Sequence, residues 1–303
     1  RRCTLGYGCA QRADARDLIQ RMAIHSKRRI GGRVRREDNM YEFNYKRPAS
    51  LADAVSALQA AEDGQFLAGG HTLLPTLKQR LARPSDLIDI SQIGELSGIS
   101  VEGDTVTVGA TTTHAEVNGS NAVQGAIPAL ADLAGMIGDP QVRHRGTIGG
   151  SVANNDPAAD YPAASLALGA TINTDQRSIS ADDFFTGMFE TALNDGEIIK
   201  SVTFPNAAKA AYVKFPNPAS RYALVGVFVA QAADGVRVGV TGATDHAHRG
   251  PRLEKALSDN WSTDALDGVT LPVEHMNSDI HGSAEYRAHL VIVMGKRAVA
   301  AAG

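Results

Sequence analysis

The chain contains Ala68-Gly69-Gly70-His71-Thr72 and, about eighty residues later, Thr147-Ile148-Gly149-Gly150-Ser151. Both loops couple paired glycines to a hydroxyl side chain. Glycine tolerates positive φ and lets the backbone approach a ligand, so that successive N–H groups can converge on an anion, and Thr72 and Ser151 add hydroxyl donors. Two such loops are able to clamp one pyrophosphate, although paired glycines after an apolar run are also typical of an ordinary turn.

The sequence around the first loop favours a nucleotide site over a turn. The loop follows the strand-like Gln65-Phe66-Leu67 and precedes residues 73–81, whose apolar positions have helical spacing. A phosphate there would meet backbone donors and a helix N-terminus. Both loops lack the Gly-x-Gly-x-x-Gly of Rossmann folds and the Gly-Lys-Ser/Thr of P-loops. The sequence therefore predicts a nucleotide that is held in another way.

Several ordered segments resemble one known family over nearly all of the chain from Met40 onward. They are Tyr45-Lys46-Arg47-Pro48, Leu87-Ile88-Asp89-Ile90, the two glycine loops, and residues 142–162 around the second loop. The chain resembles the FAD-binding medium subunit of molybdenum hydroxylases, the family of aerobic carbon monoxide dehydrogenase and the bacterial xanthine dehydrogenases. The resemblance implies an α+β fold, with an FAD-binding domain of the p-cresol methylhydroxylase type that consists of two α/β subdomains.

The resemblance also implies a set of cofactor contacts. In that family both glycine loops bind the FAD pyrophosphate, and an Asp-Pro-Ala-x-Asp segment lies beside the FAD. We therefore expect noncovalent FAD, and neither catalytic nor metal-binding side chains on this chain. The expected cofactor-binding residues are Ala68, Gly69, Gly70, His71, Thr72, Leu73, Thr147, Ile148, Gly149, Gly150, Ser151, Asp156, Asp160 and Tyr222.

Asp156 and Asp160 lie on either side of Pro157-Ala158-Ala159. Paired carboxylates can serve acid–base catalysis or a hard metal ion, but the proline favours a loop or a helix start. Asp160 is the preferred contact for ribityl or ribose hydroxyls, and Asp156 is the second candidate or a helix cap. His71 either touches phosphate or caps the following helix, and its backbone matters more than its ring.

Tyr222 precedes an apolar strand over residues 224–230. Strand propensity favours a core position for this aromatic ring, whereas the resemblance implies that the ring lies over one face of the isoalloxazine. Lys214 and Arg221 can supply charge near the flavin, but their direction stays open. Residues 143–145 are either a solvated basic turn or a balance for phosphate charge.

Composition limits the remaining possibilities. The chain has 303 residues, 43% of them hydrophobic, which suffices for two domains. No apolar run approaches the roughly 20 residues that span a bilayer. The two cysteines, Cys3 and Cys9, lie before Met40. Residues 40–303 thus lack the ligands of an iron–sulfur cluster, and electrons have to come from another polypeptide or a soluble substrate.

Residues 1–39 differ from the rest of the chain in charge. They carry a net charge of +7, which leaves −10 for the remaining 264 residues. A basic segment can bind nucleic acid or act as a transit peptide, but this one has no clean amphipathic stripe. We expect a non-native or disordered extension with Met40 as the natural start, and no nucleic-acid partner.

The coarse secondary structure agrees with this organisation. The FAD-binding domain is expected over residues 40–208 and a C-terminal flavoprotein domain over 209–303, with a three-stranded antiparallel sheet packed by helices. In the first domain the pattern predicts strands over 40–45, 65–67 and 87–90, helices over 51–61, 73–82, 113–118 and 129–137, and hairpins over 99–108 and 170–179. In the second it predicts strands over 211–215, 224–230 and 236–241, helices over 252–257, 262–266 and 284–301, and a solvated loop, not a metal site, at Asp245-His246-Ala247-His248.

The functional expectation follows from the resemblance. The FAD of this chain takes electrons from a [2Fe–2S] subunit and passes them to NAD⁺, a quinone or oxygen, while a large subunit with the molybdenum cofactor oxidises the substrate. A dimer of heterotrimers in the cytoplasm is expected, with association at the inner face of the membrane left open. Two alternatives remain: a stand-alone flavin oxidoreductase of the p-cresol methylhydroxylase class, and a noncatalytic FAD-binding module.

Overall fold

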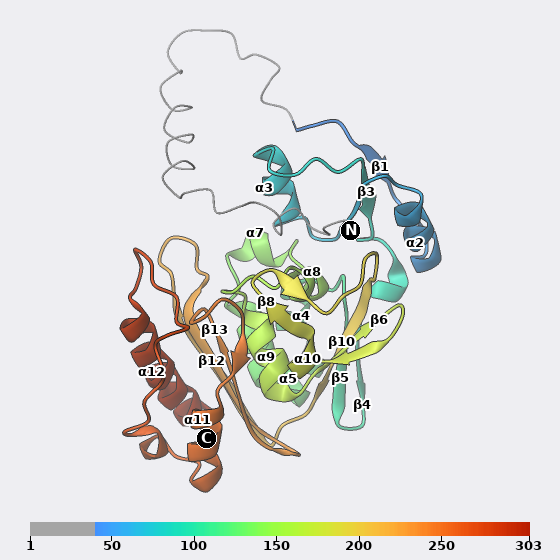
Figure 1. Ribbon diagram of the computed structural model, residues 1–303. Coiled ribbons are helices and arrows are strands. Elements are labelled where there is room, and N and C mark those ends of the chain that lie inside the picture. The colour runs from blue at the N-terminus through green and yellow to red at the C-terminus, as the bar shows by residue number, and fades with distance from the viewer. Residues whose placement is uncertain (1–39) are drawn as a thin grey trace.

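The computed structural model describes residues 40–303, so the expected extension over 1–39 lies outside the described residues. The first subdomain is a small parallel sheet with a helix on each side (Figure 1). Its strands pair in the order β1-β3-β2, and the chain order of the elements confirms the predicted β-α-β-α-β start. The elements are β1 (Asn44–Lys46), α2 (Leu51–Gln59), β2 (Gly64–Leu67), α3 (Leu73–Lys78) and β3 (Asp86–Asp89).

The second subdomain contains an antiparallel sheet in the order β4-β5-β10-β6-β7. Both predicted hairpins are present, as β4 with β5 and β6 with β7. The strands are β4 (Ile99–Glu102), β5 (Thr105–Gly109), β6 (Thr171–Thr174), β7 (Ser178–Ser180) and β10 (Ile199–Pro205), and a small hairpin consists of β8 (Phe185–Gly187) and β9 (Glu190–Thr191). The helical segments are η2 (Gly94–Leu96), α4 (His114–Gly119), α5 (Asn121–Ala126), α6 (Pro128–Gly135), α7 (Pro140–Arg143), α8 (Ile148–Asn154), α9 (Asp160–Leu168) and α10 (Ala181–Phe184).

Several of these elements, among them α8, α9 and β10, were not predicted from the sequence. Every residue of α9 is buried. A helix that is buried all round has no polar face, so it shows no amphipathic period. The second glycine loop is the first turn of α8, because Thr147 is its N-cap and accepts a hydrogen bond from the backbone N–H of Gly150 at 3.2 Å.

The C-terminal sheet has the three predicted antiparallel strands and a short fourth one, in the order β11-β12-β13-β14. The prediction of a solvated loop at residues 245–248 was wrong at its end, because His248 pairs with Val240 and Ala247 is buried. These elements are β11 (Lys209–Pro216), β12 (Ala223–Ala232), β13 (Gly235–Thr241), β14 (His248–Arg249), α11 (Pro251–Asp259), η3 (Asp264–Leu266) and α12 (Ala284–Ala302).

The C-terminal sheet is covered on both faces. On one face Val227, Val229 and Val240 pack against α11 and α12. On the other face Tyr212 and Phe228 belong to the core of the second subdomain, next to α9. Two-sided burial explains why β12 is apolar along most of its length instead of alternating.

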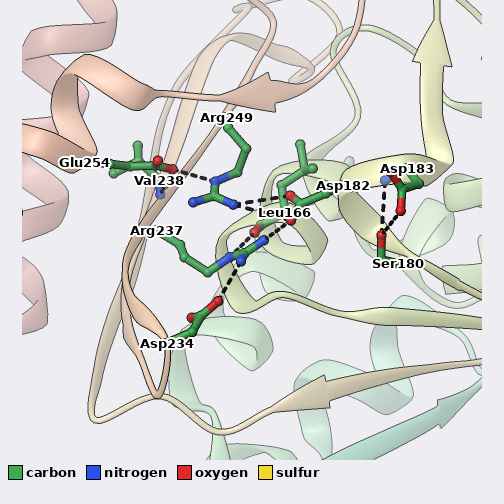
Figure 2. A network of polar contacts seen from close by, with 9 residues as sticks. All are labelled: Leu166, Ser180, Asp182, Asp183, Asp234, Arg237, Val238, Arg249 and Glu254. Carbon is green, nitrogen blue, oxygen red and sulfur yellow. Dashed lines mark hydrogen bonds and ion pairs between the residues drawn. The ribbon is translucent and has the colours of Figure 1, made fainter.

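A polar network also joins the C-terminal sheet to the second subdomain. Figure 2 shows Arg237 of β13 and Arg249 of β14 directed at Asp182 of α10, with nitrogen–oxygen distances of 2.6 and 3.3 Å. Arg237 also donates to the carbonyl of Leu166 in α9 at 3.0 Å. The C-terminal sheet is thus held to the second subdomain by charge as well as by apolar packing. Among residues 40–303, no helix is long and apolar enough to cross a membrane.

Candidate cofactor site

The first glycine loop lies directly against the backbone that leads into the second loop. A Cβ placed on Gly69 would be 2.1 Å from the carbonyl oxygen of Arg145 and 2.9 Å from the Cα of Gly146. Only glycine permits this approach, because any side chain would overlap the backbone of the segment that leads into the second loop. The fold therefore brings together two loops that are far apart in the sequence.

The first loop leaves a row of backbone donors open. Within residues 40–303, the backbone N–H groups of residues 69–72 have no hydrogen-bond acceptor. Gly70 has a φ of 75°, in the left-handed region, and His71 and Thr72 are exposed. His71 does not cap α3, since Thr72 occupies the N-cap position and makes no side-chain cap bond. Successive unpaired N–H groups at a left-handed bend fit an oxyanion such as a pyrophosphate.

The second loop is built differently, because the backbone N–H groups of residues 148–151 are already paired. Gly149 donates to the carbonyl of Ala110 at 2.8 Å, and a Cβ on Gly149 would be 2.5 Å from the Cβ of Ala110. Its glycine thus makes room for the end of β5, a role that sequence reasoning missed. Gly150 is exposed and Ser151 is half-buried, so these two residues present the open side of the loop. The other pairings are Ile148 to Thr112, Gly150 to the Thr147 side chain, and Ser151 to the Thr147 carbonyl.

His114 contacts the backbone where the first loop meets the segment before the second loop. The sequence analysis did not select this residue. The residue is 4% exposed, its backbone N–H donates to the carbonyl of Gly146 at 3.0 Å, and its ring packs against Tyr161. Burial, with smaller contributions from the charges of His71 and Arg143, lowers the pKa of His114 to about 4. The imidazole is therefore neutral near pH 7 and adds no charge beneath the loops.

Asp160 lies at the N-terminus of α9 and has partners inside the protein. Its carboxylate accepts a hydrogen bond from the Tyr212 hydroxyl and pairs with the Lys214 ammonium at 3.1 Å, where both charged side chains are 5% exposed. Burial raises the pKa of Asp160 above its usual range, although the Lys214 charge and the hydrogen bond from Tyr212 act in the opposite direction. Lys214, whose direction the sequence left open, thus points inward. The FAD contact of Asp160 stays a prediction. A cofactor hydroxyl there would share the carboxylate with the Tyr212 hydroxyl and the Lys214 ammonium.

Asp156 and Tyr222 lie close to this ion pair. Asp156 accepts from the Ala158 N–H at 2.9 Å, so it caps a turn and not α9, whose N-cap position is Ala159. Tyr222 is 47% exposed, which contradicts the core position that strand propensity favoured. Burial, and then the carboxylates of Asp156 and Asp160, raise the pKa of Tyr222. The hydroxyl of Tyr222 therefore lies within electrostatic range of both carboxylates, and its ring is available to a ligand.

The remaining basic residues have structural contacts. Arg143 donates to the carbonyls of Ile137 and Gly138 at 3.0 and 3.2 Å, and Arg221 reaches the same Gly138 carbonyl at 3.3 Å. Arg221 thus ties the segment before Tyr222 to the turn that precedes α7. In the part of the chain that the structure describes, no group of histidine, cysteine, aspartate and glutamate residues is arranged to hold a metal ion.

Comparisons with known proteins show the family of this chain. Residues 41–207 match the family described as the FAD binding domain in molybdopterin dehydrogenase. The chain is 37% identical to the carbon monoxide dehydrogenase medium chain of Hydrogenophaga pseudoflava, over 86% of this chain and 96% of that protein. It is 36% identical to the nicotine 6-hydroxylase medium subunit of Paenarthrobacter nicotinovorans, over 86% and 97%. A crystal structure of quinoline 2-oxidoreductase from Pseudomonas putida 86 superposes with a TM-score of 0.79 at 30% identity, over 87% and 98%.

The family match and the fold define an FAD-binding protein of the oxidoreductase class. Within that class, the chain belongs to the family of FAD-binding medium subunits of molybdenum hydroxylases.

Proposed function

We propose that the chain is the FAD-carrying electron-transfer subunit of a molybdenum hydroxylase. It takes electrons from a [2Fe–2S] partner subunit and passes them to an external acceptor, which is NAD⁺, a quinone or oxygen. The observation that carries this proposal is that the chain spans 96% of a carbon monoxide dehydrogenase medium chain, while its residues 40–303 contain no cysteine. A cysteine-ligated cluster therefore belongs to another subunit.

When bound, FAD supplies the electron transfer, and the protein supplies binding and orientation. The open N–H groups of residues 69–72 hold the pyrophosphate, and Gly150 and Ser151 close the site from the second loop. Asp160 would accept a hydrogen bond from a hydroxyl of the cofactor, and the exposed ring of Tyr222 would cover one face of the isoalloxazine. FAD is held without a covalent bond.

Substrate oxidation is assigned to a separate large subunit with the molybdenum cofactor, in a dimer of heterotrimers. Two relatives of almost equal similarity, 37% and 36% identical, are named for carbon monoxide and for nicotine. Such different substrates with equally similar medium subunits favour a substrate site on another chain. We propose a cytoplasmic location, with association at the inner face of the membrane as the open alternative.

Co-purification with its partner subunits tests this proposal. The chain alone should bind FAD but reduce no dye with any substrate, and the chain expressed together with a molybdenum-cofactor subunit and a ferredoxin-like subunit should show substrate-dependent dye reduction. Dye reduction by the chain alone with a phenolic substrate would favour the stand-alone oxidoreductase. Bound FAD that the assembled partners do not reduce would favour the noncatalytic module.

A further inference from the structure

The carboxyl ends of the small parallel sheet carry a second polar group that the proposed function does not use. Tyr45 of β1 donates a hydrogen bond from its hydroxyl to the carboxylate of Asp89, the last residue of β3. Tyr45 is 55% exposed and Asp89 is 9% exposed. An exposed aromatic ring is thus tied to an almost buried carboxylate at the rim of the sheet.

This carboxylate lies beside the first glycine loop. Asp89 pairs in register with Leu67, the last residue of β2, and Ile90 donates to the Leu67 carbonyl at 2.9 Å. The loop leaves β2 two residues later, at Gly69. Asp89 and the open donors of residues 69–72 therefore lie at the same edge of one parallel sheet.

The arrangement is a β-α-β unit in which the glycine loop follows the first strand and Asp89 ends the second. Nucleotides bind in the crevice outside the carboxyl ends of parallel strands, and an acidic residue about 20 residues after the glycines binds the ribose in dinucleotide folds. Here Asp89 follows Gly69 by 20 residues. The topology thus reproduces that geometry although the glycine fingerprint itself is missing.

Asp89 also keeps acceptor capacity for a ligand. One carboxylate oxygen accepts from the Ser91 N–H at 2.9 Å and the other accepts from the Tyr45 hydroxyl. A carboxylate has about four lone-pair sites, so about two remain for the two hydroxyls of a ribose. Burial favours the neutral acid, but the hydrogen bonds from Ser91 and Tyr45 lower the pKa of Asp89. The group is therefore an anion near neutral pH.

We propose that Asp89 binds the ribose of the adenosine half of FAD, and that Tyr45 is a positioning residue that fixes the carboxylate. The inference rests on the proposed function, in which residues 69–72 hold the pyrophosphate. Asp160 begins α9 and Tyr222 directly precedes β12, and both of these elements lie in the larger body of the molecule, whereas β3 lies in the small subdomain (Figure 1). With the flavin ring beside Tyr222 and the pyrophosphate on residues 69–72, the adenosine would extend into the small subdomain, where Asp89 lies at the same sheet edge as the loop.

The test compares FAD with FMN, which has the flavin and one phosphate but no adenosine. Both are titrated into apoprotein, and flavin fluorescence gives the dissociation constants. Asp89→Asn should weaken FAD binding by about 10-fold to 100-fold, as expected for a hydrogen bond to a charged group, and should leave FMN binding within about twofold. Tyr45→Phe retains the ring and should weaken FAD alone, by about 3-fold to 10-fold.

Asp86→Asn is the matched control, since Asp86 is a buried, ion-paired carboxylate at the opposite end of the same strand. It should leave the ratio of FAD to FMN affinity unchanged. Equal losses for both ligands in Asp89→Asn, or unchanged FAD binding, would overturn the assignment. If Asp89→Asn does not fold, Tyr45→Phe decides by the same ratio. A wild-type protein that binds neither flavin would instead refute the proposed function, and this inference with it.

Discussion

Gly69→Ala should separate the two glycine loops and weaken FAD binding. The new Cβ would be 2.1 Å from the carbonyl oxygen of Arg145. An ordinary carbon–oxygen contact is about 3.3 Å, so the loops have to move apart by roughly 1 Å. Neither contact atom is the flexible end of a side chain, because both loops meet through backbone.

The magnitude follows from the cost of overpacking. Forcing one extra carbon into a close-packed contact costs about 1–3 kcal/mol. In the apoprotein the loops can relax apart, but FAD that spans both loops requires the docked arrangement. The dissociation constant for FAD should therefore rise by about 5-fold to about 150-fold.

Fluorescence titration of the apoprotein measures this constant, and thermal unfolding of the same samples reports stability. Gly94→Ala is the control, because nothing lies within 4 Å of a Cβ at that position. The control should bind FAD like the wild type. A Gly69→Ala protein with wild-type affinity would refute the reasoning, since it would show that FAD does not need the contact between the loops.

Three further predictions follow from the site. His114→Gln should flatten the pH dependence of the free energy of unfolding. The wild type should lose about 3 kcal/mol of that free energy as the pH falls from about 6.5 to about 4, because the unfolded chain binds the proton first. An equal loss in the variant would exclude His114 as the cause. Tyr222→Ala should alter the flavin spectrum and the reoxidation rate in stopped-flow measurements but change the melting temperature little, because the ring is 47% exposed; a large stability loss with wild-type reoxidation would contradict a role over the flavin. A chain that begins at Met40 should retain its FAD content and melting temperature, and lower FAD occupancy would show that residues 1–39 contribute to the site.

The sequence allowed the first loop to be predicted because its signal is local. Glycines after a short apolar strand and before a helical pattern leave few other structures, and residues 69–72 do form an open turn at the end of β2. The second loop carries an equally strong glycine signal with a different physical cause. Gly149 makes room for Ala110. A contact between positions so far apart in the sequence leaves no periodic or compositional trace.

A helix that holds part of the site could not be predicted from the sequence, because burial on all sides leaves no amphipathic pattern. Helix α9 carries Asp160 at its first position, yet its residues are buried on every face. The partners of that carboxylate, Tyr212 and Lys214, follow more than fifty residues later in β11. The sequence identified Asp160 through the resemblance and the acceptor chemistry of a carboxylate. It left the direction of Lys214 open, because a side chain's direction depends on tertiary packing and not on spacing.

Helix α9 packs closely on the C-terminal sheet. The ion pair between Asp160 of α9 and Lys214 of β11 therefore joins the two predicted domains. A Cβ on Gly239 of β13 would be 2.0 Å from the carbonyl oxygen of Ala163 in α9, so backbone meets backbone there as it does between the glycine loops. The new sheet begins at Lys209, where the predicted second domain starts, but its inner face shares a core with the first. A domain boundary at residue 208 therefore separates the C-terminal sheet from the sheet of the second subdomain, but the two sheets still share one hydrophobic core. Because interiors at this packing density transmit displacements, the contact between α9 and the sheet couples the position of Asp160, the first residue of α9, to that of Tyr222, which directly precedes β12.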